Sequence, residues 1–443
     1  MSTAGPRRHV LAATALVVLA GAGLLLDPAR ADGSAVLSSG MQHVTRVPLP
    51  GAVSVAFDSR RPVAYVVTRE HGGTVATVDM ADPRRPRVLG TLAVPSQAYM
   101  EDVSVGERPD GTTFLLVREV DGVRVVDVTD PGAPRSRGFL DVESHTWTCV
   151  DAGCSHAYGT RNGFTGTGVF AVVDLTDLDA PRTAALLPSA VGVVHDWDRD
   201  AAGVVWAAGG NGLAAYDVTD PTRPVLVATS DAHGTKGHSE HNDQVQLHGT
   251  QRPHADRYRA GHRRDGASLE RGNVLLVSEE GNDVDCTDTV QTWHVPHLDP
   301  ALAAAESPDG LAGRGSVTPL DTWSLEDAPA SSRPPVSLLC SVHWFDARSD
   351  GFVVVPTYGS GTRVLDLREP LDIRQVAFHV ADRVQAIQSR WVPERDGTGR
   401  ATGRASRFVV TADVGTPTGF TTSPDGGLDV FEVDASALAA SWR

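Results

Sequence analysis

A short β-forming run that ends in aspartate and leads into a proline turn recurs along the chain. It reads "TVATVDMADPRRP", "GVRVVDVTDPGAP", "GVFAVVDLTDLDAP", "GLAAYDVTDPTRP" and "GTRVLDLREPLDI", with weaker copies "TVQTWHVPHLDP" and "GLDVFEVDAS". The apolar run favours a strand, and the Asx-Pro pair favours a tight turn. The sequence therefore repeats one small structural unit.

The spacing of the copies predicts the fold. The aligned strand ends are Asp79, Asp127, Asp174, Asp217 and Asp366, with Trp293 or His294 and Glu432 in the other two units. Units of about 40 to 50 residues, each with four short strands, are typical of β-propeller blades. Seven copies predict an all-β fold, a single seven-bladed propeller over residues 32–443. Since the ring must close, we expect segment 42–50 to pair with the strand that contains Val430.

The phrase "VRVVDVTDPGAP" resembles the LVIVD-repeat family of extracytoplasmic β-propeller proteins. The resemblance covers nearly all of residues 50–435 and implies a propeller fold, but it implies little about activity. The fifth unit departs most from the family pattern, because "TWHVPHLDP" replaces its Asp-x-x-Asp-Pro phrase.

The first residues have the pattern of a secretory signal peptide. Arg7 and Arg8 precede an apolar run from Val10 to Leu26, and "ARA" at 29–31 has the form of a cleavage site. We expect residues 1–31 to be removed from a secreted protein; the alternative is an uncleaved anchor, and either general or twin-arginine export fits. No later apolar run is long enough to span a membrane. The net charge of −16 argues against nucleic acid as a partner.

Histidines occur at matching places in several units. "HTWTCVDAG" from His145, "HDWDRDAAG" from His195 and "HWFDARSDG" from His343 align without gaps, and each has a glycine eight residues after the histidine. "HNDQVQLHG" from His241 gives the same spacing in the fifth unit. We expect these four histidines to open the innermost strands of blades three to six and to converge at the channel mouth.

Convergent imidazoles favour a metal site. Neutral imidazole is a ligand for Zn, Cu and Fe, so His145, His195, His241 and His343 are the predicted metal ligands. The possible supporting residues are Glu101, Asp102, His238 and Glu240. The alternative is that the histidines line a wet channel and bond to water and to neighbouring blades.

Four cysteines in an exported chain predict two disulfides, out of three possible pairings. Cys149 and Cys154 flank the turn between two strands and can bridge a hairpin. Cys286 and Cys340 fall on the same face of blades five and six, so we expect them to form the second bond. A rival interpretation makes cysteines metal ligands, since Cys340 is close to His343 in sequence.

Two segments, 250–272 and 301–335, are longer than the repeat requires and are predicted insertions in blade five. The sequence identifies no substrate. We expect a monomeric binding module that presents the channel face to an unknown ligand or protein. The alternative is a metalloenzyme, redox or hydrolytic, that uses the four predicted histidine ligands.

Overall fold

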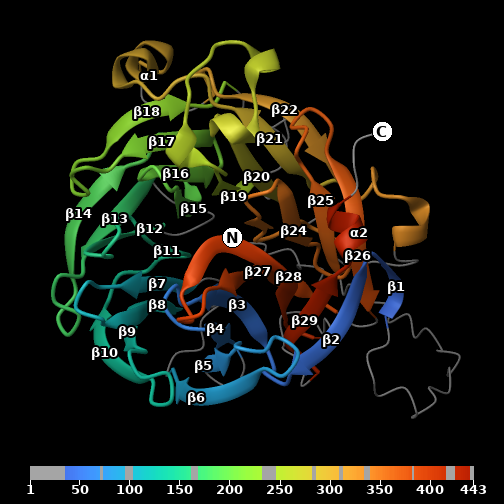
Figure 1. Ribbon diagram of the computed structural model, residues 1–443. Coiled ribbons are helices and arrows are strands. Elements are labelled where there is room, and N and C mark those ends of the chain that lie inside the picture. The colour runs from blue at the N-terminus through green and yellow to red at the C-terminus, as the bar shows by residue number, and fades with distance from the viewer. Residues whose placement is uncertain are drawn as a thin grey trace, which may run out of the picture. The chain divides into compact units, whose positions relative to one another are not determined.

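Seven antiparallel sheets follow one another along the chain and are arranged around a central axis (Figure 1). The structure is a computed structural model that describes residues 35–443 except 70–72, 95–102, 161–167, 232–245, 282–285, 309–312, 334–339, 382–383, 416–424 and 440–443. The predicted signal peptide, residues 1–31, lies outside the described residues. The seven-bladed, all-β fold predicted from the repeat is confirmed.

The first four blades each use four consecutive strands, numbered from the innermost outward. Blade one contains β3 (Ala52–Phe57), β4 (Val63–Thr68), β5 (Thr74–Asp79) and β6 (Arg87–Ala93). Blade two contains β7 (Val103–Glu107), β8 (Thr113–Glu119), β9 (Gly122–Asp127) and β10 (Arg135–Leu140). Blade three contains β11 (Trp147–Cys149), β12 (His156–Thr160), β13 (Val169–Asp174) and β14 (Arg182–Pro188). Blade four contains β15 (Val194–Arg199), β16 (Val204–Gly209), β17 (Gly212–Asp217) and β18 (Val225–Thr229).

The last three blades include the irregular ones. Blade five contains β19 (Gln246–Gln251), β20 (Val274–Glu280), β21 (Val290–His294) and β22 (Thr318–Trp323). Blade six contains β23 (Asp346–Ala347), β24 (Phe352–Pro356), β25 (Thr362–Asp366) and β26 (Arg374–Ala381), with β1 (Ala35–Ser39) added outside β26. Blade seven contains β27 (Ala386–Arg395), β28 (Ala401–Asp413), β29 (Gly427–Val433) and β2 (Met41–Val47).

The N-terminal strand closes the ring. In Figure 1 the blue β2 lies beside the red β29, and their pairing runs from Met41 opposite Val433 to Val47 opposite Leu428. Thr45 lies opposite Val430, so the pairing predicted for segment 42–50 is confirmed. Strand β1, which the repeat does not predict, pairs with β26 of the neighbouring blade. Strands β2 and β29, from opposite ends of the described chain, are thereby held in one sheet, and β1 extends the sheet of blade six.

The core lies between neighbouring blades. The middle strands are apolar on both faces, and β4, which reads VAYVVT, is buried at every position. The outer strand β6 is mostly exposed. Buried apolar residues of the described chain form seven clusters, one for each pair of neighbouring blades. Burial on both faces explains why the repeat has continuous apolar runs instead of strict alternation.

The aspartates of the repeat cap turns. In five blades the side chain at the end of the third strand accepts a hydrogen bond from the backbone N–H two residues later. These residues are Asp79, Asp127, Asp174, Asp217 and Asp366. An Asx turn of this kind fixes the direction in which the chain leaves the strand.

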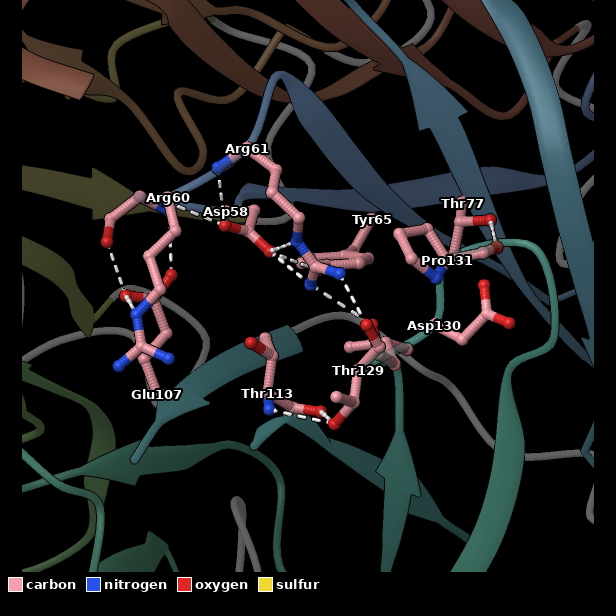
Figure 2. A network of polar contacts seen from close by, with 12 residues as sticks. Asp58, Arg60, Arg61, Tyr65, Thr77, Glu107, Thr113, Thr129, Asp130 and Pro131 are labelled. Carbon is pink, nitrogen blue, oxygen red and sulfur yellow. Dashed lines mark hydrogen bonds and ion pairs between the residues drawn. The ribbon is translucent and has the colours of Figure 1, made fainter. Parts of the chain in front are cut away.

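The turns also join one blade to the next, as Figure 2 shows for blades one and two. Asp58, in the turn after β3, accepts hydrogen bonds from Arg61 Nη2 (2.6 Å) and from the Tyr65 hydroxyl (2.6 Å). Arg61 also donates to the backbone carbonyls of Val128 (3.1 Å) and Thr129 (2.6 Å) in the turn of blade two. The repeated phrase therefore serves both the turn and the contact between blades.

Blade five is the most elaborate. Segment 250–272 joins β19 to β20 and contains η2 (Ala255–Arg257), η3 (Arg264–Gly266) and η4 (Leu269–Arg271). Segment 301–335 includes most of α1 (Pro300–Glu306), the outer strand β22, and η5 (Ala330–Ser332), so part of this predicted insertion belongs to the blade itself. The last helix, α2 (Ala435–Leu438), follows β29. None of the described helices has the length and apolar character needed to cross a membrane.

Candidate metal centre

Four histidine rings follow one another across neighbouring blades, near the beginnings of the inner strands. His145 precedes β11, His195 lies in β15, His248 lies in β19 and His343 precedes β23. The ring centroids of successive residues are 4.4, 4.2 and 4.3 Å apart. We call these four residues the histidine row.

Two members of the histidine row lie in β-bulges. The pairing of β15 with β16 shifts between Val194 and Asp196, and the pairing of β19 with β20 shifts between Leu247 and Thr250. His195 and His248 fall inside these irregularities. A bulge changes the direction of the side chains it carries and is common beside functional sites. The same backbone feature therefore directs both rings into the row.

The blade-five position assigned to His241 by sequence is held by His248. His241 itself lies outside the described residues, as do the possible supporting residues Glu101, Asp102, His238 and Glu240. The alignment relied on a glycine eight residues after each histidine, and Gly249 satisfies that spacing from His241. However, Gly249 lies within β19 and not in the turn after it. The spacing rule did not select His248, because segment 250–272 displaces the turn of this blade.

A carboxylate that the sequence interpretation missed faces the histidine row. Glu280 is the last residue of β20, and its Oε2 lies 3.4 Å from His248 Nε2 and 3.8 Å from His195 Nε2. Its Oε1 lies 3.5 Å from His343 Nε2 and accepts a hydrogen bond from the Tyr358 hydroxyl. A sequence signal did exist, because other blades have "AYG", "AAG" or "TYG" where blade five has "EEG".

His248 is the most deeply buried member of the row. Its relative exposure is 0%, and neither ring nitrogen has a hydrogen-bond partner in the part of the chain that the structure describes. Burial, together with the neighbouring His195 and His343, holds the pKa of His248 well below its usual value. The ring is therefore neutral, and in this state one of its two nitrogens carries a lone pair that can bind a metal ion.

His343 is held in a defined orientation. Its Nδ1 lies 2.7 Å from the backbone carbonyl oxygen of Ile387, which can only accept a hydrogen bond. The proton is thus placed on Nδ1, and in the neutral ring Nε2 carries a lone pair on the side of Glu280. A backbone carbonyl behind the ring is the usual way in which a metal-binding histidine is oriented.

Trp344 bounds the row on one side. Its ring centroid lies 4.7 Å from that of His248 and 4.3 Å from that of His343. The indole N–H donates to Asp196 Oδ2 at 3.3 Å, which ties blade six to blade four. The aromatic ring limits access of water to the histidines from this direction.

Both predicted disulfides are confirmed. Cys149 is bonded to Cys154, and Cys286 is bonded to Cys340. All four cysteines are used, so none is a metal ligand. The second bond joins the connection that follows Glu280 to the segment that leads into His343, and it therefore fastens the backbone on both sides of the row.

The donor set suits a transition metal. The donor atoms of His195, His248 and Glu280 all lie within 4.8 Å of one another. Ligands bound to Zn²⁺ at about 2.0–2.1 Å stand roughly 3.3 Å apart in a tetrahedral arrangement. A small inward movement of these three side chains would bring them to bonding distance, and His145 and His343 flank the group as further donors.

No family model matches the chain, and no curated protein matches its sequence. Solved propellers are similar to it in fold. The β-propeller domain of Myceliophteria thermophila Cps50 (Swd1) superposes with a TM-score of 0.54 at 12% identity, over 89% of this chain and 99% of that chain. U3-55K gives 0.54 at 8% identity over 88% and 98%, and the RRP9 WD40 repeats give 0.54 at 8% over 90% and 99%. At such low identity the likeness shows the fold alone.

Proposed function

We propose that this protein is an exported binding propeller whose channel mouth holds a transition-metal ion between His195, His248 and Glu280. The observation that supports the proposal best is His248, a fully buried neutral imidazole without a hydrogen bond from the described residues. Leaving such a group unsatisfied costs about 1–3 kcal/mol. A metal ion would satisfy the nitrogen and would neutralise Glu280 at the same time.

The water-lined channel is the competing account of the same histidines. Water in a channel bonds to side chains that it can reach, but His248 has no accessible surface. The rings of its neighbours and of Trp344 surround it. The geometry at His248 therefore favours an ion bound between side chains over bulk-like water.

The chemical types of the ligands limit which metal ions the site can bind. Two imidazoles and a carboxylate form the donor set of many three-ligand zinc sites and of non-haem iron sites, and imidazole-rich sites also bind copper. We propose Zn, Cu or Fe as the bound ion, with a remaining coordination position that faces the channel mouth. A ligand or protein partner of the propeller would approach from that face.

Three features support the proposal of export. The first residues have the signal-peptide pattern, the chain forms two disulfides, and the repeat resembles that of the extracytoplasmic LVIVD propellers. Disulfides persist in oxidising compartments. N-terminal sequencing of protein recovered outside the cytoplasm should begin at Asp32; recovery of the intact N-terminus from the cytoplasm alone would contradict the proposal.

Metal analysis of three matched proteins tests the metal site. The untagged wild type, His248→Ala and His262→Ala are purified without chelator and assayed for Zn, Cu and Fe. His262 is an exposed histidine outside the row and serves as the control. Wild type and His262→Ala should retain the ion. His248→Ala should lose metal affinity by more than about 100-fold, because losing a ligand costs more than losing a residue that only hydrogen-bonds to a ligand. Equal metal content in all three proteins would refute the site.

A further inference from the structure

Another space lies among the inner strands, beside the histidine row. The inner strands surround a cavity of about 370 Å³, within the size range of small-molecule sites. Trp344 and Asp196 line it, and Trp344 is also in ring contact with His248 and His343. Trp344 therefore contacts both the histidine row and the cavity, and none of the four histidines lines the cavity.

The cavity has more negative than positive groups. Asp198 of β15, Asp346 of β23 and Arg390 of β27 line it from three different blades, together with Asp196. Arg390 Nη1 lies 3.6 Å from Asp346 Oδ1, so the guanidinium group forms its ion pair mainly with that carboxylate. Asp346 also accepts a hydrogen bond from the backbone N–H of Trp391 at 2.8 Å. These partners offset part of the cost of burying Asp346, although burial still raises its pKa.

The cost of burying Asp198 is offset less than the cost of burying Asp346. Burial, followed by repulsion from Asp200, raises its pKa to about 7, and the attraction of Arg390 does not offset these effects. Asp346 repels it as well. Nevertheless, Asp198 keeps part of its surface accessible, and that surface belongs to the cavity lining. A carboxylate in this setting gains most from a positive charge placed in the cavity.

Part of the lining is apolar. Phe57 of β3 is partly exposed, and Val103, Val105 and Pro393 lie among the same lining residues. These side chains suit a hydrocarbon or aromatic body, while Asp198 suits a charged end. Pockets that combine an apolar wall with a few placed polar groups are typical binding sites for small molecules.

We propose that this cavity binds a small organic cation, an ammonium or guanidinium group carried on a short apolar body. The charged group pairs with Asp198, and the apolar body packs against Phe57 and the neighbouring aliphatic side chains. The proposal does not require a metal in the histidine row, because none of the four histidines lines the cavity.

Titration calorimetry with three probes of matched size tests this. Benzylammonium, benzyl alcohol and benzoate share a phenyl ring and are similar in size, and the group attached to the ring is positive, neutral or negative. Wild-type protein at pH 8 should bind benzylammonium and neither of the other two. Equal binding of benzyl alcohol, preferential binding of benzoate, or absence of benzylammonium binding would overturn the proposal, and these outcomes need no variant to fold.

Variants then test whether Asp198 is the residue that pairs with the ammonium group. Asp198→Asn should weaken benzylammonium binding by about 30-fold or more, since it removes one member of a desolvated charge pair. Asp121→Asn, an exposed change on the surface, is the matched control and should bind as the wild type does. Unchanged binding by a folded Asp198→Asn protein would overturn the assignment. His248→Ala should still bind benzylammonium, which separates this proposal from the metal site.

The pH dependence gives an independent readout. With a pKa of about 7 in the free protein, only a small fraction of Asp198 is ionised at pH 5. Benzylammonium affinity should therefore fall about 100-fold between pH 8 and pH 5. The charged groups that face Asp198 are Asp200, Asp346 and Arg390, and the same pH series on Asp198→Asn should be nearly flat. A flat wild-type profile would contradict pairing with Asp198.

Discussion

At the scale of single residues, Glu280 determines the geometry of the candidate metal centre. One carboxylate oxygen accepts the hydrogen bond from Tyr358, and the other faces His195 and His248. Tyr358 has a φ of +42°, a left-handed conformation that costs a residue with a side chain about 1 kcal/mol or more. Such strain is typical of positions where a side chain must be placed for function. Tyr358 is therefore a positioning residue for Glu280.

Replacing Tyr358 by phenylalanine tests that role. Tyr358→Phe removes only the hydroxyl that holds Glu280, so metal affinity should fall by about 10-fold with little change in stability. Tyr158→Phe is the matched control, because the Tyr158 hydroxyl bonds to the Pro221 carbonyl in another part of the ring. A competition titration against a metal-binding dye measures the metal affinity of both variants. Equal affinities for the two variants would contradict a positioning role.

The sequence pattern selected three of the four histidines in the row and did not select His248, for a local reason. His145, His195 and His343 lie in blades whose first turn has the usual length, so one spacing rule applies to all three. In blade five, segment 250–272 follows β19 directly and the rule selects His241 in place of His248. Glu280 was missed because it comes from a second strand, and the pattern used only first strands.

At the scale of elements, the two disulfides differ in the length of chain that they close. Cys149 and Cys154 are separated by five residues and close a hairpin. Cys286 and Cys340 are separated by 54 residues and join blade five to blade six beside the histidine row. A longer closed loop restricts the unfolded chain more. The second bond is therefore the more important one for stability.

Paired alanine variants measure this difference. Replacing Cys286 and Cys340 should lower the free energy of unfolding by about 4 kcal/mol, and replacing Cys149 and Cys154 by about 2 kcal/mol. Urea denaturation of both double variants against the wild type gives the two values. A larger loss from the hairpin pair would show that local strain, and not loop length, decides the effect.

We expect acid to weaken the contact between β2 and β26. His379 of β26 is buried, and burial followed by the nearby His43 lowers its pKa to about 4. Unfolded His379 takes up a proton near pH 6.5, whereas the folded protein resists protonation until about pH 4. The folded state thus binds fewer protons in this window, and its stability falls as the pH drops from about 6.5 towards 4.

His379→Phe removes this acid-sensitive group and keeps a ring against Phe431. Between pH 7 and pH 4.5 the wild type should lose on the order of 2–3 kcal/mol more than the variant, which follows from the shifted pKa. Urea midpoints at the two pH values provide the comparison. Parallel losses in both proteins would place the acid sensitivity elsewhere.

The elements that the sequence did not predict have a common cause. β1 pairs with the outer strand of blade six, and β22 lies inside the segment 301–335. Neither contains the Asp-Pro phrase that identifies the third strand of a blade. Whether a segment forms an edge strand depends more on pairing with a neighbouring strand than on its own apolar pattern. The sequence repeat therefore predicts the middle strands of each blade better than the outer strands.

At the scale of the whole molecule, the histidine row spans blades three to six. A metal bound by His195 of blade four and by His248 and Glu280 of blade five would bind only the assembled ring. Free metal at 100 times its dissociation constant should raise the free energy of unfolding by about 2.7 kcal/mol. Thermal unfolding with and without added metal, after chelator treatment and dialysis, measures the shift. Identical melting temperatures would contradict a site shared between blades.

The overall charge agrees with the two proposed ligands. The chain has a net charge of −16, and both the metal ion and the organic cation are positively charged. An acidic protein attracts such ligands over a distance of about one Debye length, 8 Å at physiological salt. The same charge disfavours nucleic acid. The net charge of the molecule therefore favours the approach of cations.

The most direct test of the metal site is a crystal structure of the metal-loaded protein with anomalous diffraction data at the absorption edge of the bound element. We predict one strong anomalous peak about 2.0–2.2 Å from the Nε2 atoms of His195 and His248 and from Glu280 Oε2. Crystals of His248→Ala should lack the peak. A peak only at histidines outside the row, such as His254 or His262, or a water molecule at the predicted position in metal-loaded crystals, would contradict the account.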